Sequence, residues 1–139
     1  MYLVDLCTMS QVELKNQNLS MRIEDGVLIT IFAKGVFIDL NTIKKAENSR
    51  KVLLVGNKCP VIVDFTKADV FTHEAKHYTN SDAYIESFLS VAVIVDAKWK
   101  EMLANVYIKF KTFSVPMKVF SDLELARDWS KQHLEQTIV

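Results

Sequence analysis

The chain has 139 residues, its 17 Lys and Arg residues balance 17 Asp and Glu residues, and 50% of its side chains are hydrophobic. A chain of this length is predicted to form one domain that buries roughly 68–70% of its unfolded surface. Its basic residues are spread along the chain rather than clustered with aromatic ones, which argues against a nucleic-acid-binding protein.

The cysteine pattern and the hydropathy exclude further classes. Cys7 and Cys59 lie far apart with no C-x-x-C spacing, so neither a disulfide framework nor a zinc cage is expected. Asp5 interrupts the apolar residues near the N-terminus, and no basic segment precedes them. No stretch reaches the roughly 18 apolar residues of a membrane span, so the sequence predicts a soluble, cytoplasmic protein.

Two strands joined by a tight turn are predicted first in chain order. Leu19–Glu24 and Val27–Ala33 flank Asp25-Gly26, a dipeptide that suits the positive φ angles of a two-residue hairpin. Residues 1–18 carry no cap or turn signal and are expected to form a tail or an added edge strand.

An amphipathic helix is predicted after the hairpin. Asp39 or Asn41 can cap its start, and Gly56 stands where its C-terminal cap is expected. The basic side chains of this segment are predicted on the wetter side of the helix; they are Lys44, Lys45, Arg50 and Lys51.

Two apolar runs are predicted as central strands of a parallel sheet. Pro60–Phe65 and Ser90–Val95 are rich in β-branched residues and too continuous for a strand with one wet face. Between them, Thr72 is predicted to cap a short helix that runs to about Asn80.

A long helix is predicted after the second of these strands. Asp96 can cap it, and it spans Ala97–Phe113. Its apolar residues recur at helical spacing; they are Trp99, Met102, Leu103, Val106, Phe110 and Phe113.

The last strand and helix carry the clearest start signal. The strand is expected at Pro116–Phe120 and the helix from Asp122 to about Leu134. Ser121 with Glu124 matches a capping box, and a hydrophobic staple is expected between the residues at positions 120 and 125. Two residues of this helix are expected to face the sheet, Ala126 and Trp129.

The predicted order is therefore ββαβαβαβα, an α/β fold with right-handed crossovers. We expect a mixed five-stranded sheet in which the first strand is antiparallel and the rest are parallel, flanked by helices.

This order and several motifs resemble the SpoIIAA-like, or STAS, superfamily. The motifs are the Asp25-Gly26 hairpin, PVIVDFT from Pro60, THEAK from Thr72, SVAVIVD from Ser90, LANVYIKF from Leu103 and VPMKVFSDLELARDW from Val115. The F-x-[DN]-x-x-x-A-x-x-W closing pattern is similar to that of small stand-alone bacterial members of unknown function. The resemblance implies one SpoIIAA-like domain at residues 19–134, with tails at 1–18 and 135–139.

The resemblance also implies a function. It suggests a non-enzymatic regulatory or protein-interaction module, of the kind that antagonises anti-sigma factors. In the best-known members a phosphorylated serine begins the helix after the second parallel strand. The D-S-S-G-L-like motif around that serine is absent here, and the nearest hydroxyl residues, Thr66 and Thr72, are the candidate phosphorylation sites. For Thr72, a helix cap is the competing interpretation.

His73, Glu74 and His77 form a formal H-E-x-x-H match, the pattern of a catalytic zinc site. Helical spacing places the two histidines on the solvent side, and no third ligand stands at a suitable spacing. We therefore predict a solvated helix face and no metal.

Asp64, Asp96 and Asp122 all fall near the carboxyl ends of predicted strands, where open α/β sheets usually bind ligands. A magnesium site is conceivable there. Helix capping is the favoured interpretation, since carboxylates stabilise the first turns of helices.

The helix Ala97–Phe113 is apolar on more than one face. We expect Tyr107, Ile108 and Lys111 to form an interaction surface for another protein or for a second copy of the chain, giving a homodimer. The alternatives are a pocket for a small apolar, lipid-like ligand and a broad core face. No nucleophile has a base at a readable spacing, so the sequence predicts neither an enzyme nor a cofactor.

Overall fold

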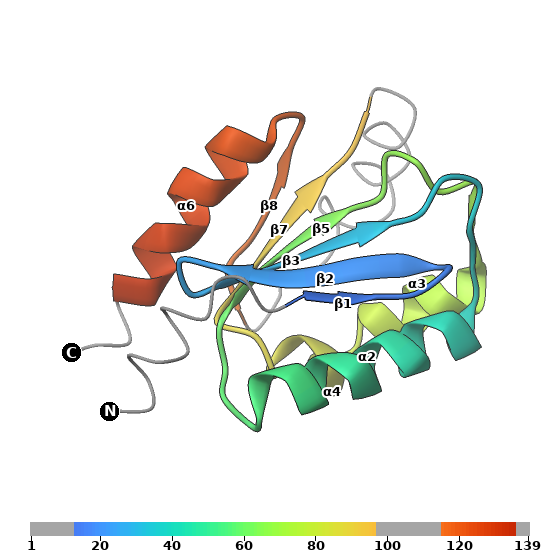
Figure 1. Cartoon of the computed structure of the whole chain (residues 1–139), viewed down its shortest axis with the longest axis horizontal. Coiled ribbons are helices and arrows are strands. Elements are labelled where there is room, and N and C mark those ends of the chain that lie inside the picture. The colour runs from blue at the N-terminus through green and yellow to red at the C-terminus, as the bar shows by residue number, and fades with distance from the viewer. Residues whose placement is uncertain (1–12, 97–114, 136–139) are drawn as a thin grey trace.

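Figure 1 shows a twisted β-sheet with helices on both of its faces, in a computed structural model that describes residues 13–96 and 115–135. Six described strands form one sheet in the order β1-β2-β3-β5-β7-β8. The first three strands pair antiparallel and the others parallel. Their bounds are Glu13–Lys15, Leu19–Glu24, Val27–Phe32, Pro60–Asp64, Ser90–Ile94 and Met117–Phe120. The α/β class and the mixed sheet are confirmed.

The sheet has six strands rather than five, because β1 is the added edge strand that was one of the two expectations for residues 1–18. In β1, Leu14 pairs with Met21 of β2, and Leu14 packs against the core. Only three residues take part. A strand this short has too few residues for alternation to be recognised in the sequence.

The predicted hairpin turn is confirmed at Asp25 and Gly26, whose φ angles are 51° and 81°. Glycine is required at the second position. A Cβ atom built there would lie 2.8 Å from Cδ1 of Leu134 on the C-terminal helix.

The strands β5 and β7 occupy interior positions of the sheet, as their continuous apolar sequences predicted. Val61 and Val91 face one core and Ile62 and Ala92 face the other. Burial on both faces explains why neither strand alternates between polar and apolar residues.

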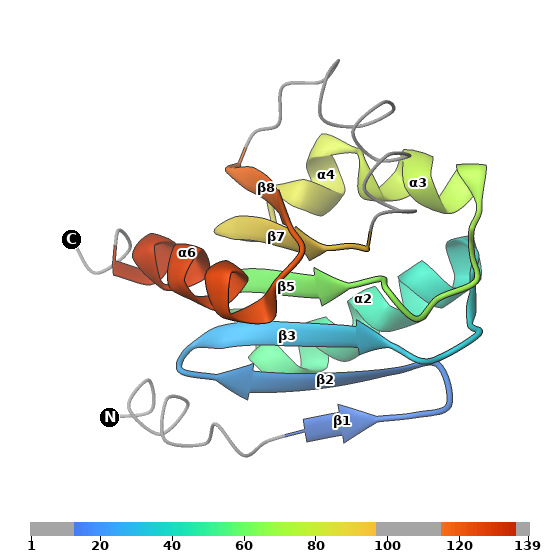
Figure 2. The same ribbon diagram turned by 90° about the horizontal axis from the view of Figure 1, so that it is seen from above.

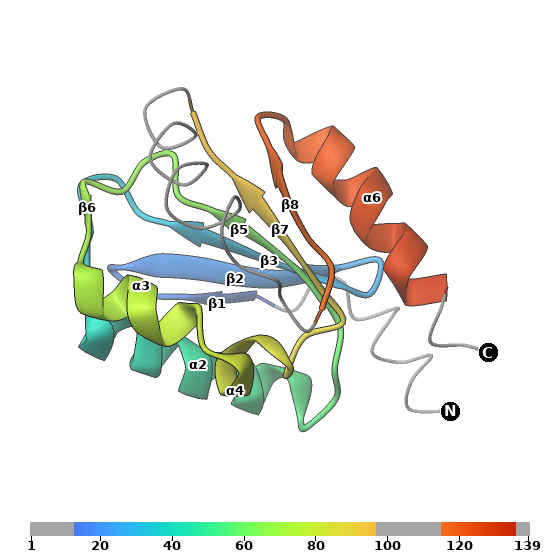
Figure 3. The same ribbon diagram turned by 180° about the vertical axis from the view of Figure 1, so that it is seen from behind.

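The larger core lies between the sheet and three helices, α2 (Leu40–Leu54), α3 (His73–Thr79) and α4 (Asp82–Ile85). Figures 2 and 3 show these helices together on one face. On the opposite face α6 (Leu123–Glu135) packs across β3, β5 and β7, with Ala126 buried and Trp129 against the same cluster, as predicted.

The helix α2 starts as predicted but ends differently. Asp39 caps it by accepting a hydrogen bond from the backbone N–H of Thr42 at 2.8 Å. At the other end Val55, rather than Gly56, is the C-cap, with φ 50° and ψ 46°. The helix continues to Leu54 because that side chain is buried in the core.

The start of α6 also corrects the sequence analysis. Its cap is Asp122 rather than Ser121, because the Asp122 carboxylate accepts a hydrogen bond from the N–H of Glu124 at 3.0 Å. Phe120 packs on Trp129 with ring centroids 5.7 Å apart, whereas Leu125 is 57% exposed. The predicted staple between positions 120 and 125 is therefore wrong.

Two short parallel strands, β4 (Phe37–Ile38) and β6 (Val70–Phe71), form a second small sheet that the sequence did not predict. They flank the start of α3, where the N–H of Thr72 donates to the carbonyl of Ile38. Thr72 caps α3 as predicted.

The predicted helix 97–113 lies outside the described residues. Among the residues that are described, no helix is long and apolar enough to cross a membrane.

Candidate functional site

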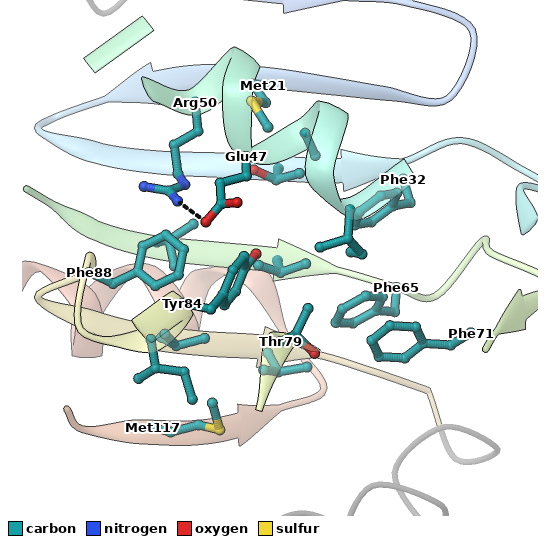
Figure 4. A pocket seen from close by; sticks show the side chains of 18 of the residues that line it. Met21, Phe32, Glu47, Arg50, Phe65, Phe71, Thr79, Tyr84, Phe88 and Met117 are labelled. Carbon is teal, nitrogen blue, oxygen red and sulfur yellow. Dashed lines mark ion pairs between the residues drawn. The ribbon is translucent and has the colours of Figure 1, made fainter. Parts of the chain in front are cut away.

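A pocket of about 80 Å³ lies inside the larger core, between the sheet and the helices α2, α3 and α4. Its floor is formed by strand residues such as Met21, Val61 and Val93, and α2 covers it through Ile43 and Ala46. Figure 4 shows these side chains converging from strands and helices that lie far apart in the sequence. The lining is mostly apolar, which favours an apolar ligand.

Aromatic rings line one end of the pocket. Phe65 stacks on Phe32 with ring centroids 5.5 Å apart and on Phe71 at 5.1 Å. All three side chains are buried. This end, at the right of Figure 4, carries no charged side chain among its labelled residues.

The other end holds an ion pair. Arg50 Nη2 lies 3.6 Å from the Glu47 carboxylate, and both side chains project from α2 toward the rings of Tyr84 and Phe88 (Figure 4). Arg50 is only 5% exposed. Its guanidinium carbon lies 4.4 Å from the centroid of the Phe88 ring and 5.9 Å from that of Tyr84. The prediction that Arg50 lies on the wetter side of the helix is therefore wrong.

Glu47 has a second partner, whereas Nη2 of Arg50 has no hydrogen bond within the described residues. The Tyr78 hydroxyl donates to Glu47 Oε1 at 2.5 Å, and this hydrogen bond raises the pKa of Tyr78 above its ordinary value. Arg50 Nη2 is buried and has no hydrogen-bond acceptor within the described part of the chain. The pocket therefore contains a buried cationic donor that its surroundings do not satisfy.

Cys59 lies near this polar end but is buried. Burial raises the pKa of its thiol to about 11, although a hydrogen bond with the Leu28 backbone and the charge of Arg50 act in the opposite direction. The thiolate is the nucleophilic form of cysteine. Cys59 is therefore a core side chain and not a reactive one.

Comparison with known proteins identifies the family and the fold. A family model described as a domain of unknown function, DUF7793, matches residues 21–134. The chain belongs to this family.

Among solved structures, this DUF7793 domain is similar to an uncharacterized protein of the DUF3478 family with a SpoIIAA-like fold, from Shewanella loihica PV-4. The two share 18% identity over 86% of this chain and 90% of the other, with a TM-score of 0.52. No curated protein matches. The likeness confirms the SpoIIAA-like fold, and at this identity it carries no function.

The H-E-x-x-H residues of the DUF7793 domain lie on α3. His73, Glu74 and His77 are all exposed, which agrees with the solvent side that helical spacing predicted. Ala75, between them, is fully buried against the core. Within residues 13–96 and 115–135, no group of three or more His, Cys, Asp or Glu side chains is placed to hold a metal ion.

The two candidate phosphorylation sites have different surroundings. The Thr66 hydroxyl donates to Asp64 Oδ1 at 2.6 Å, and the Thr66 N–H donates to the same oxygen at 2.8 Å. The Thr72 hydroxyl instead accepts from the N–H of Ala75 at 3.2 Å, as a helix cap. A phosphate on Thr66 would face a carboxylate, whereas one on Thr72 would still accept from the helix.

Two of the three carboxylates predicted near the strand ends accept hydrogen bonds from residues close to them in sequence. Asp64 accepts from Thr66 and Asp122 caps α6. Asp96 is exposed at the end of the segment after β7. The predicted surface at Tyr107, Ile108 and Lys111 lies outside the described residues.

Sequence reasoning missed the pocket, although it left an apolar-ligand site open. The two charged residues at its polar end, Glu47 and Arg50, are three positions apart on α2, and this spacing brings their side chains to one face of the helix. That signal was available in the sequence. Burial of the pair depends on Tyr84 and Phe88, which come from a helix of four residues and the turn after it.

Proposed function

We propose that this domain is a non-enzymatic binding module whose pocket takes a small apolar ligand. The supporting observation is the pocket itself, with aromatic rings at one end and an ion pair at the other. Among its described lining residues, the ionisable side chains are Glu47, Arg50 and Tyr84.

Mass spectrometry under native conditions tests this proposal. Protein purified gently from its own cells is expected to retain a small bound molecule that is lost on denaturation. The variant Ala46→Leu, which adds bulk to the α2 side of the pocket, is expected to lose it. The control Lys51→Leu introduces the same residue at an exposed position of the same helix and is expected to keep it. A clean unliganded mass for the wild type, with no uptake of added hydrophobic probes, would contradict the proposal.

A second candidate role is self-association as a regulatory interaction module, and a specific surface favours it. Phe37 and Val70 are paired in the small sheet and are 56% and 40% exposed, next to the start of α3. Exposed apolar side chains that adjoin one another are typical of interaction surfaces. We propose that a second copy of the chain covers them, because symmetric pairs are the commonest assembly.

Sedimentation measures this association. The wild type is expected to form dimers at tens of micromolar, and Phe37→Asp is expected to remain monomeric. Val52→Asp serves as the control, because Val52 is 76% exposed on α2, outside the small sheet. Equal behaviour of the wild type and Phe37→Asp would rule out this surface.

Regulation by phosphorylation is part of the same proposal, with Thr72 favoured over Thr66 by their surroundings. A cytoplasmic location in bacteria is proposed with it. Mass spectrometry of the protein from its own cells is expected to find phosphate at Thr72. Phosphate at Thr66 alone, or at neither residue under several growth conditions, would contradict this assignment.

A further inference from the structure

We infer that the pocket's ligand is a small monocarboxylate, whose carboxylate pairs with Arg50 and whose apolar tail lies among the aromatic rings. This inference rests on the proposed binding function and names the chemical class of the ligand.

The first support is that Arg50 is buried and incompletely hydrogen-bonded. A guanidinium that is 5% exposed has lost nearly all contact with water, and a buried charge is costly unless it is both paired and hydrogen-bonded. Glu47 supplies the opposite charge, but at 3.6 Å the pair is too long for a hydrogen bond. Nη2 therefore has a donor left for an anion, and a carboxylate is the planar acceptor that suits a guanidinium.

The pairing pattern also argues against a cationic ligand. A cation would need a negative partner, and the anionic side chain among the described lining residues is Glu47, which already accepts from Tyr78 at 2.5 Å and faces Arg50. The described surroundings thus satisfy the carboxylate better than the guanidinium. A bound anion would give Arg50 a second negative partner, so that Arg50 lies between Glu47 and the ligand.

The size of the pocket restricts the tail. Its volume is about 80 Å³, roughly half of the ~150 Å³ engineered cavity that binds benzene. The pocket is smaller than a cavity that holds a benzene ring, so it suits a short acyl chain and not a ring or a long-chain lipid. The stacked rings of Phe32, Phe65 and Phe71 are the apolar surface that such a tail would contact.

The experiment compares acids with alcohols of the same shape. Isothermal titration of the full chain uses butyrate with 1-butanol and 3-methylbutyrate with 3-methyl-1-butanol. We expect each acid to bind about ten- to a hundredfold more tightly than its alcohol, because hydrogen bonds to charged groups contribute about 1.5–3 kcal/mol. Equal affinity of acid and alcohol would overturn the carboxylate inference while keeping the apolar pocket. Binding of neither would overturn the pocket function as well.

Variants then assign the selectivity to Arg50. Arg50→Met keeps an unbranched side chain and removes the charge, so the preference for acid over alcohol is expected to disappear while alcohol binding persists. The persisting alcohol binding also shows that the variant is folded. Lys51→Met removes the same charge from the neighbouring exposed position and is expected to leave the preference unchanged. Loss of the preference in Lys51→Met, or its survival in Arg50→Met, would contradict the assignment.

Glu47→Gln provides a test in the opposite direction. It removes the negative charge that competes with the ligand for Arg50, so the acids are expected to bind more tightly than to the wild type, with little change for the alcohols. Weaker acid binding in Glu47→Gln, with alcohol binding intact, would contradict a ligand carboxylate that competes with Glu47 for Arg50, and with it the carboxylate inference.

Discussion

Val55 ends α2 in a left-handed backbone conformation, with φ 50°, although a β-branched residue rarely adopts it. Its side chain is 77% exposed, so no burial offsets this conformational cost. The position is held by its neighbours, because Leu54 is buried and the Val55 N–H donates to the carbonyl of Lys51 at 3.0 Å.

Replacing Val55 with a residue that tolerates this conformation is therefore expected to stabilise the domain. We predict that Val55→Asn raises the free energy of unfolding by roughly 1 kcal/mol, the order of the left-handed penalty of an ordinary residue. Urea denaturation followed by circular dichroism measures it. Val52→Asn, at an exposed helical position, is the control and is expected to give no gain.

The hydrogen bonds of Asp39 are expected to make the stability of the domain depend on pH. Its hydrogen bonds from the backbone and hydroxyl of Thr42 hold the pKa of the carboxyl below its ordinary value. A lowered pKa in the folded state stabilises the protein above the ordinary Asp value of about 3.9, and this stabilisation is lost as the pH falls through the lowered value.

The variant Asp39→Asn keeps a side-chain acceptor but cannot titrate. We expect wild type and variant to respond alike to pH above about 5, and the wild type to lose more stability than the variant below about pH 4. Denaturant titrations at several pH values measure the difference. Parallel pH profiles would show that the Asp39 cap does not contribute to acid unfolding.

At the scale of elements, α6 is the described helix that covers the second face of the sheet (Figure 1). Its contact depends on a small residue, because Ala126 is fully buried and α6 packs closely on β5 and β7. Leu125, its neighbour in sequence, is 57% exposed. Substitutions at these two residues therefore distinguish the packing of α6 on the sheet from the intrinsic stability of the helix.

Enlarging the buried position is expected to disturb this docking. Ala126→Leu should lower the free energy of unfolding by about 1–3 kcal/mol through overpacking. Leu125→Ala should change it by less than about 0.5 kcal/mol, as at ordinary surface positions. Thermal and urea denaturation of both variants measure this contrast. A large loss of unfolding free energy in Leu125→Ala would instead support the hydrophobic staple that the sequence suggested.

For the whole molecule, the pocket lies between the sheet and the helices α2 and α4, so a bound ligand links elements that are distant in sequence. A ligand that binds only the folded state stabilises it in proportion to the logarithm of its concentration. Butyrate at about 100 times its dissociation constant is expected to add roughly 2.7 kcal/mol to the free energy of unfolding. Thermal melts at increasing concentrations measure the effect. An unchanged melting temperature in wild type would argue against a ligand confined to the folded state.

Sequence by itself determined the main elements and their order, because the signals for them are local. The Asp25-Gly26 turn needs only the φ preferences of its residues. The continuous apolar runs of β5 and β7 record burial on both faces, and Asp39 and Thr72 are caps that act within one helical turn. The SpoIIAA-like resemblance rests on the same residues.

Tertiary structure decided the features that depend on contacts between distant segments. Arg50 occupies a helix position that looks exposed in sequence, and it is buried because Tyr84 and Phe88 lie against it. The third antiparallel strand exists because β2 offers an unpaired edge to three residues whose own pattern is too short to recognise. The pocket likewise belongs to no single segment: its rings and its ion pair are brought together by the sheet order, which local sequence does not encode.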